Sequence, residues 1–193
     1  MSVHVLRTSD YRRMRWKNGG GWTTELAVGA STNESAFDWR ISIADIESDG
    51  PFSAFAGCDR HIALLDGTGM EIDFDEAPQV RLDQRLRFFA FAGEWTARGR
   101  LIGGPVRDFN VIVRRDAYRA EALHRPLVGP MVFLPEAGTT WFVHLVGGQA
   151  ELKDTTTGAL AAGESLLLQP DDSGRSRVLT GGGEVVLVKL VRC

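Results

Sequence analysis

The chain is poor in residues that cross-link a fold or ligate metals. Of its 193 residues only two are cysteines, Cys58 and Cys193, and they form no Cys-x-x-Cys pair, so we expect no disulfide framework. The histidines are too far apart in sequence for the close imidazole pair of a strand-borne metal site: His4, His61, His124 and His144. We therefore expect neither a metal nor another cofactor.

Long apolar runs and an excess of one charge are also missing. No apolar stretch approaches the roughly 18 residues of a membrane-spanning helix, and Met1–Arg7 lack a signal-peptide pattern. The 22 Lys and Arg residues are balanced by 25 Asp and Glu residues, which gives no general attraction to nucleic acid or to anionic membranes. We expect a cytoplasmic protein that binds neither of them. Its oligomeric state stays open, a homodimer included.

Glycine is abundant, with 22 residues, which indicates many tight turns. Between the turns lie short segments typical of β-strands, several of which alternate apolar and polar residues. The predicted strands are 39–44, 61–65, 70–74, 86–91, 109–113, 141–146, 149–152, 165–168 and 185–191. The turn residues 66–69 predict a β-hairpin over 61–74. Helical signals are weak, since residues 116–123 contain good helix formers but no clear amphipathic period. The pattern predicts an all-β fold.

A faint internal repeat divides the chain. Leu65–Ile72 resembles Leu145–Leu152, and Phe91–Glu94 resembles Ala161–Glu164, although the shared residues are few and of common types. Taken at face value, the repeat predicts one compact unit over 1–193 made of two β-barrel halves. The halves would span approximately 1–115 and 116–193, with an exchange of strands between them left open.

Polar residues gather among glycines and aromatic residues in four stretches, 15–25, 37–45, 49–60 and 103–115. In the first, Asn18, Thr23 and Glu25 flank three glycines, and a plain glycine-rich turn is the alternative. In the third, Asp59 and Arg60 directly precede an apolar strand, which places both charges at a barrel mouth or a sheet edge.

The second and fourth stretches are predicted strands with polar faces. Arg40 and Ser42 share one face, because successive side chains alternate. If that face points into a barrel, Arg40 is a buried cation that needs a carboxylate, from the protein or from a ligand. Asp108, Asn110 and Arg114 share a strand face in the same way, and Asp108 or Asn110 is a candidate partner for Arg40. A solvated outer face is the alternative.

Together these stretches resemble the HutD/Ves family. The matching segments are Trp16-Lys17-Asn18-Gly19-Gly20-Gly21-x-Thr23-x-Glu25, Phe37-x-Trp39-Arg40-x-Ser42-Ile43-Ala44, Asp49-Gly50-Pro51-Phe52-Ser53-x-Phe55-x-Gly57-x-Asp59-Arg60 and Gly104-Pro105-x-x-Asp108-Phe109-Asn110 with Arg114-Arg115. The resemblance implies a cupin-like double β-barrel (bicupin) of two jelly-roll-like halves without a metal triad. It also implies an association with bacterial histidine utilisation or, for Ves-type members, with environmental stress. It brings no established reaction.

The resemblance and the polar stretches predict a metal-free protein that binds a small carboxylate metabolite of histidine utilisation. Urocanate or a formylated or formimino glutamate is the expected ligand, sensed or buffered so that the pathway is moderated. Arginines would supply a fork for the carboxylate, neutral side chains would add hydrogen bonds, and tryptophan would form an apolar wall. The expected ligand-binding residues are Trp16, Asn18, Thr23, Glu25, Trp39, Arg40, Ser42, Asp59, Arg60, Asp108, Asn110 and Arg114.

Two other functions stay open, and no catalytic residue is assigned. The first is a cofactor-independent isomerase or lyase that acts on a small carboxylate, with Glu25, Asp59 or Asp108 as the general base. The second is a structural or protein-interaction role, in which the polar residues hold the two halves together. The first would consume the ligand, and the second would bind none.

Overall fold

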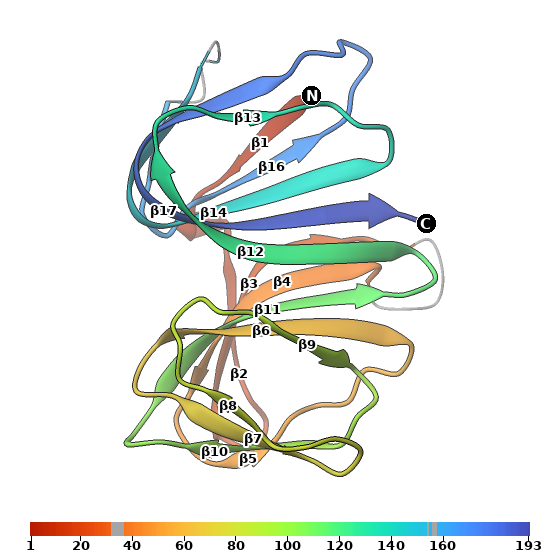
Figure 1. Ribbon diagram of the computed structural model, residues 1–193, viewed down its shortest axis with the longest axis vertical. Helices are drawn as coiled ribbons and strands as arrows, with labels where there is room; N and C mark the ends of the chain where they lie inside the picture. Colours follow the sequence, from red (N-terminus) through yellow and green to blue (C-terminus); the bar gives the residue numbers. More distant parts are fainter. Residues whose placement is uncertain (32–36, 154, 156–157) are drawn as a thin grey trace. The chain divides into compact units, whose positions relative to one another are not determined.

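The computed structural model describes residues 1–31, 37–153, 155 and 158–193, and these residues are almost entirely strands and turns (Figure 1). The all-β prediction is confirmed. The chain divides into two units. The first unit is Tyr11–Tyr118, and the second joins Met1–Asp10 to Arg119–Cys193. No helix among the described residues is long and apolar enough to cross a membrane.

The first unit contains two antiparallel sheets. One has the strand order β2-β3-β4-β11-β6-β9 and the other the order β5-β10-β7-β8. The strands are β2 Arg12–Arg15, β3 Gly21–Gly29, β4 Trp39–Ile46, β5 Gly50–Pro51, β6 Cys58–Asp66, β7 Met70–Phe74, β8 Val80–Leu82, β9 Phe89–Ala92, β10 Ala97–Leu101 and β11 Val106–Arg114. The central strands β4, β11 and β6 position the polar residues discussed below.

The second unit has the central strand order β1-β16-β14-β17-β12, with β13 added to β17 and β15 added to β14. Its elements are β1 Ser2–Leu6, the 3-10 turn η1 Thr8–Asp10, β12 Tyr118–Val128, β13 Met131–Phe133, β14 Thr139–Leu152, β15 Ala159–Ala161, β16 Ser165–Gln169 and β17 Arg177–Arg192. The strand β1 at the start of the chain pairs with β16, far along the sequence. The helix-forming residues 116–123 lie largely in β12, where pairing with β17 overrides local propensity.

The predicted hairpin over 61–74 is wrong. β6 pairs with β9 and β11 in one sheet, whereas β7 pairs with β8 and β10 in the other. Gly67 and Gly69 do make the turn, and both have positive φ. Their turn carries the chain from one sheet to the next. A turn signature in a sequence shows where a strand ends, but it does not show which strands pair.

The predicted repeat is only partly matched by topology. β14 pairs with β16 through its first residues and with β15 through its last, as β6 pairs with β9 and β7 pairs with β8. Leu145–Leu152 in β14 thus corresponds to Leu65–Ile72. The second match does not correspond, because Gly93–Glu94 follow β9 whereas Gly163–Glu164 precede β16. Gly-Glu is a general turn pair in both places.

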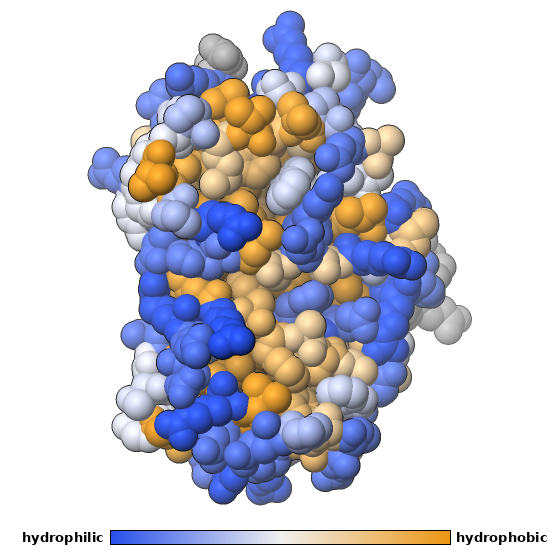
Figure 2. Space-filling view, viewed as in Figure 1, coloured by the Kyte–Doolittle hydropathy of each residue, from blue (hydrophilic) through white to orange (hydrophobic). Residues whose placement is uncertain are grey.

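Each unit has its own apolar core. In the first unit it includes Ile62, Leu64, Met70, Ile72 and Val106. In the second unit it includes Val143, Leu145, Leu166, Leu187 and the fully buried side chain of Met1. Hydrophilic side chains border the apolar atoms that remain visible at the surface (Figure 2).

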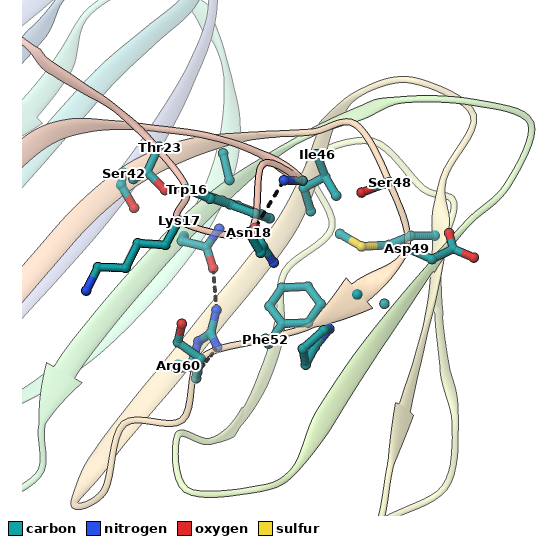
Figure 3. Close-up of a pocket in the computed structure, with 18 of the residues that line it drawn as sticks. Trp16, Lys17, Asn18, Thr23, Ser42, Ile46, Ser48, Asp49, Phe52 and Arg60 are labelled. Carbon is teal, nitrogen blue, oxygen red and sulfur yellow. Dashed lines mark hydrogen bonds between the residues drawn. The ribbon is translucent and has the colours of Figure 1, made fainter.

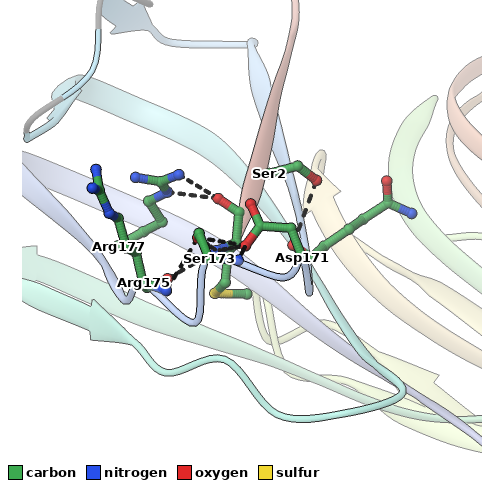
Figure 4. Close-up of polar contacts among 7 residues, drawn as sticks. Ser2, Asp171, Ser173, Arg175 and Arg177 are labelled. Carbon is green, nitrogen blue, oxygen red and sulfur yellow. Dashed lines mark hydrogen bonds and ion pairs between the residues drawn. The ribbon is translucent and has the colours of Figure 1, made fainter.

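Polar contacts hold Met1 in place in the second unit (Figure 4). Its ammonium group donates hydrogen bonds to Asp171 Oδ1 at 2.8 Å and to the carbonyl oxygen of Arg175 at 2.9 Å. The Nε of Arg177 donates to the Met1 carbonyl oxygen at 2.8 Å. The ammonium group lowers the pKa of Asp171 to about 2. These bonds anchor the start of β1 beside the loop that follows β16.

Candidate functional site

A cavity of about 600 Å³ lies within the first unit (Figure 3). This volume is in the range of small-molecule sites. The cavity is lined by Arg15, Trp16, Lys17, Asn18, Gly20, Thr23, Arg40, Ser42, Ala44, Ile46, Ser48, Asp49, Gly50, Pro51, Phe52, Ser53, Phe55, Arg60, Met70, Gly99, Leu101, Asn110 and Ile112. Strands β4, β6 and β11 supply the polar residues at its centre.

The sheet register places two arginines on either side of one isoleucine. Ile112 on β11 is directly opposite Arg40 on β4 and directly opposite Arg60 on β6. Strands are about 4.8 Å apart, so the backbones of the two arginines are about 10 Å apart across the sheet. In the adjacent row, Asn110 is opposite Ser42.

Alternation explains why these polar residues share the cavity face. On β4, Arg40 and Ser42 alternate with Ile41 and Ile43, and all but Arg40 are buried. On β11, residues 108, 110 and 112 alternate with Phe109, Val111 and Val113 in the same way. The sheet is therefore apolar on the face turned away from the cavity and partly polar on the face that lines it.

Arg60 is almost completely buried, with 5% of its surface exposed. Its Nη1 donates to the carbonyl oxygen of Ser53 at 3.2 Å, and its Nη2 donates to Asn110 Oδ1 at 2.9 Å. Its guanidinium carbon lies 5.3 Å from the ring centre of Phe52 and 5.5 Å from that of Phe55. The Nε is buried and has no hydrogen-bond acceptor among the described residues. Burial lowers the pKa of Arg60 to about 10, so the side chain is a cation at neutral pH.

Arg40 is the second cation of the central row. Its Nε is 3.8 Å from Glu25 Oε2, which is an ion pair but is too long for a hydrogen bond. This Nε is also buried without a hydrogen-bond acceptor among the described residues. Arg40 and Arg60 are close enough that the charge of Arg40 lowers the pKa of Arg60. The cavity wall thus includes four cationic residues, namely Arg15, Lys17, Arg40 and Arg60.

Asp108 lies on the same face of β11, two residues before Asn110, and is fully buried. Its Oδ1 accepts a short hydrogen bond from Asn110 Nδ2, and its Oδ2 has no partner among the described residues. Desolvation raises the pKa of Asp108 to about 7, although the charge of Arg60 opposes the shift. Asp108 is not part of the cavity wall.

The loop between β2 and β3 forms one rim of the cavity. The indole Nε1 of Trp16 donates to Thr23 Oγ1 at 2.8 Å, and Asn18 Oδ1 accepts from the backbone N–H of Gly20 at 3.0 Å. Gly21 must be glycine, because a Cβ there would lie 2.2 Å from the carbonyl oxygen of Asp45. The glycines of this loop therefore allow close backbone packing beside the tryptophan.

The structure brings seven of the twelve predicted site residues to the cavity wall. They are Trp16, Asn18, Thr23, Arg40, Ser42, Arg60 and Asn110. The other five, Glu25, Trp39, Asp59, Asp108 and Arg114, do not line it. Glu25 and Asp108 contact wall residues from behind, through Arg40 and Asn110 respectively.

Trp39, Asp59 and Arg114 lie away from the cavity for separate reasons. Trp39 is on the opposite face of β4 from Arg40 and packs against Gly29. Arg114 is on the same face as Asn110, but four residues carry it about 13 Å along the strand, where it pairs with Asp38 at 3.1 Å and with Asp116 at 2.8 Å. Asp59 pairs with Arg115.

The expected pairing of Arg40 with Asp108 or Asn110 is wrong. Asn110 accepts from Arg60 instead, and Arg40 pairs with Glu25 on β3. Sequence reasoning also assigned no role to Phe52, Ser53 and Phe55, which contact Arg60. Their place in the segment 49–60 was the available signal.

Among the described residues no three His, Cys, Asp or Glu side chains lie close enough together to hold a metal ion. The polar groups of the cavity-lining side chains are guanidinium, ammonium, indole, amide and hydroxyl groups, with one carboxylate, that of Asp49. This donor set suits an anion with hydrogen-bond acceptors and does not fit a metal ion.

The family model described as HutD matches residues 8–187. The chain belongs to the HutD family. The predicted resemblance is thus confirmed. This chain is 33% identical over 140 residues to the protein Ves of Cronobacter sakazakii, a match that covers 72% of this chain and 74% of the relative.

A second relative is described as an uncharacterized 21.2 kDa protein in the hutC 3' region of Pseudomonas putida. The two are 47% identical over 120 residues, which is 61% of this chain and 62% of that protein. The match therefore spans less than two thirds of this relative's length.

Solved structures agree with this membership of the HutD family. The structure of HutD from Pseudomonas fluorescens has a TM-score of 0.85 and 35% identity, with all of both chains covered. The bacterial pirin YhhW of Escherichia coli, solved with nickel(II), has a TM-score of 0.70 at 10% identity over the full length of both chains, which shows the fold alone. The predicted cupin-like fold is confirmed.

Proposed function

We propose that the cavity of the first unit binds a small carboxylate. The observation that carries this proposal is that Arg40 and Arg60 both line the cavity, whose wall holds a single carboxylate, that of Asp49. A carboxylate ligand supplies both the negative charge and the acceptor geometry that guanidinium groups match. Ser42 and Asn110, in the adjacent row, supply neutral hydrogen-bonding groups.

The size and lining of the cavity support a ligand of about ten heavy atoms. At roughly 0.7 kcal/mol per atom, such a ligand would bind with a Kd of about 10 μM. Phe52, Phe55, Ile112 and Trp16 provide apolar wall for its carbon atoms. A Kd in this range suits a protein that senses or buffers a catabolic intermediate.

We further propose that the ligand is a carboxylate metabolite of histidine utilisation, urocanate or a formylated or formimino glutamate. Membership of the HutD family supports this, as does the name of the Pseudomonas putida relative, which places that protein's gene in the hutC 3' region. Binding in the cytoplasm, where such intermediates arise, would let the protein moderate the pathway.

The positions of the three predicted general bases favour binding over proton-transfer catalysis, and the one carboxylate on the cavity wall, that of Asp49, accepts a hydrogen bond from the backbone N–H of Leu101. The candidate general bases were Glu25, Asp59 and Asp108, and none of them is on the cavity wall. A general base must come within about 3.2 Å of the proton that it removes, or reach it through one water. Asp59 in particular is held in an ion pair with Arg115.

The experiment is a thermal-shift titration with urocanate, N-formylglutamate, formiminoglutamate, histidine and formate. A ligand at about 100 times its Kd adds about 2.7 kcal/mol to the free energy of unfolding, or very roughly 5–10 °C in Tm for this size. Arg60→Lys keeps the charge but loses the planar fork, so we expect at least a tenfold loss of affinity. Arg98→Lys, an exposed arginine on β10, is the matched control.

A shift that Arg98→Lys retains and Arg60→Lys loses supports the proposal. No shift with any of the five compounds at millimolar concentration would contradict it and would favour a structural or protein-binding role.

A further inference from the structure

Asp108 is the group that the proposed carboxylate site leaves without a role. It is fully buried, it does not line the cavity, and its Oδ2 has no partner among the described residues. A carboxyl group in such a place is costly to ionise. Its hydrogen bonds are with the backbone of Ala44 on β4 and with the side chain of Asn110, and the second of these joins it to the cavity.

A short chain of hydrogen bonds connects Asp108 to the cation of the cavity. Asn110 Nδ2 donates to Asp108 Oδ1, and Asn110 Oδ1 accepts from Arg60 Nη2 at 2.9 Å. The amide of Asn110 is therefore fixed at both ends. Its oxygen faces the arginine because its nitrogen faces the carboxyl group.

The positive charge of Arg60 therefore interacts both with Asp108 and with any anion that binds in the cavity. Without a ligand, an ionised Asp108 is the acidic group whose charge acts most directly on the cation. A carboxylate that binds at Arg60 brings a second negative charge to the same buried cation. Two carboxylates that share one cation in a poorly solvated place repel each other, and one of them then binds a proton more tightly.

We infer that Asp108 is a positioning residue for the proposed carboxylate ligand and takes up one proton from solvent when that ligand binds beside Arg60. The balance is simple: the ligand enters as an anion, Asp108 gains the proton, and no bond of the ligand changes. This inference rests on the proposed function.

The other charged groups near Asp108 do not replace it as the proton acceptor. Asp45 on β4 acts on Asp108 through its charge, but it is held by Arg13 at 3.1 Å and Arg107 at 2.9 Å. On β4 and β3, Arg40 and Glu25 form their own pair. The pKa of Asp108, about 7 in the ligand-free protein, puts its titration where a shift by ligand is measurable.

The test uses formate and N-formylglutamate as probes, because their carboxylates do not titrate near neutral pH. Calorimetric titrations of the whole protein at about pH 8, in two buffers of different ionisation enthalpy, measure the protons taken up per bound ligand. We expect uptake approaching one proton, and an affinity that falls as pH rises above about 7 by up to tenfold per pH unit. Asp108→Asn should bind the probe with no proton uptake and a flat pH profile.

The matched control is Asp73→Asn, which removes an exposed carboxylate on β7 of the same unit. It should keep the proton uptake of the parent. If Asp108→Asn does not fold, carboxyl carbon NMR of the unmodified protein, with and without formate, reports whether the pKa of Asp108 rises on binding.

Binding without proton uptake, or uptake that survives in Asp108→Asn, overturns the inference and leaves the proposed function intact. An unchanged pKa of Asp108 in the NMR titration has the same meaning. Failure of both probes to bind at any pH overturns the proposed function and this inference together.

Discussion

The two units differ in the residues that line their interiors. In the second unit the inward residues of β14 and β17 are apolar, with Val143 opposite Leu187 and Leu145 opposite Val185. In the first unit the corresponding pair of strands, β6 and β11, places Arg60 opposite Ile112 and Ile62 opposite Asn110. A few inward positions on central strands therefore decide whether the interior of a unit is apolar or partly polar.

This difference gives the two units different electrostatics. Buried charge in the first unit requires a partner, since an unpaired ion in a poorly solvated interior is strongly destabilising. Arg60 and Asp108 carry opposite charges when Asp108 is ionised, and hydrogen bonds to Asn110 connect the two side chains. The core of the second unit is held by apolar contacts, and the charged group beside it, the ammonium group of Met1, pairs with Asp171.

The largest expected effect comes from removing the charge balance in the first unit. Arg60→Met leaves Asp108 buried without its cation, and breaking such a pair typically costs about 3–5 kcal/mol. We expect that loss in urea unfolding at about pH 8, and a smaller one at about pH 5, where Asp108 is protonated. Arg98→Met serves as the control, and equal stability of the two variants would contradict the pairing.

A cavity made in the second unit tests how much its apolar core contributes to stability. Leu145 is fully buried in that core, so Leu145→Ala should lower the free energy of unfolding by about 3 kcal/mol, within the range for buried leucines. Urea unfolding with an unchanged m-value would check it. A loss below 1 kcal/mol would mean that the core relaxes around the gap, and would contradict a rigid apolar core (about 24 cal/mol per Å3 of gap is usual).

The pH dependence of stability sharpens the electrostatic contrast. The folded-state pKa of Asp108 is raised from 3.8 to about 7, so its protonated form contributes stability that is complete below about pH 4 and is lost as pH rises through 7. Between about pH 5 and 7 that loss is about 2 kcal/mol. Asp108→Asn should remove this part of the slope, as measured by urea unfolding against Asp73→Asn. Parallel pH profiles for the two variants would contradict the raised pKa.

Sequence reasoning reached the β-class, the polar strand faces and seven residues of the cavity wall, because alternation along a strand is a local rule. It placed Arg40 with Ser42 on one strand face and Asp108 with Asn110 on another, and left open whether those faces point inward. It could not find which residues lie side by side on neighbouring strands, because that depends on the sheet register. Only the register shows that Ile112 separates Arg40 from Arg60. It also failed for Arg114, which is on the correct face but beyond the end of the cavity.

The smallest expected effect concerns the rim of the cavity. Thr23→Val removes the acceptor of the Trp16 indole N–H while keeping the shape of the side chain, so the loss is close to that of one hydrogen bond, about 1 kcal/mol. Because Trp16 lines the cavity, the same change should also weaken carboxylate binding by a few fold. Thr24→Val, the same substitution on the opposite face of β3, should change neither quantity by as much. If the two variants behave alike in unfolding and in calorimetric titration, the indole hydrogen bond contributes nothing measurable and Trp16 is held by packing alone. The rim of the cavity would then be stabilised in the same way as the apolar core of the second unit.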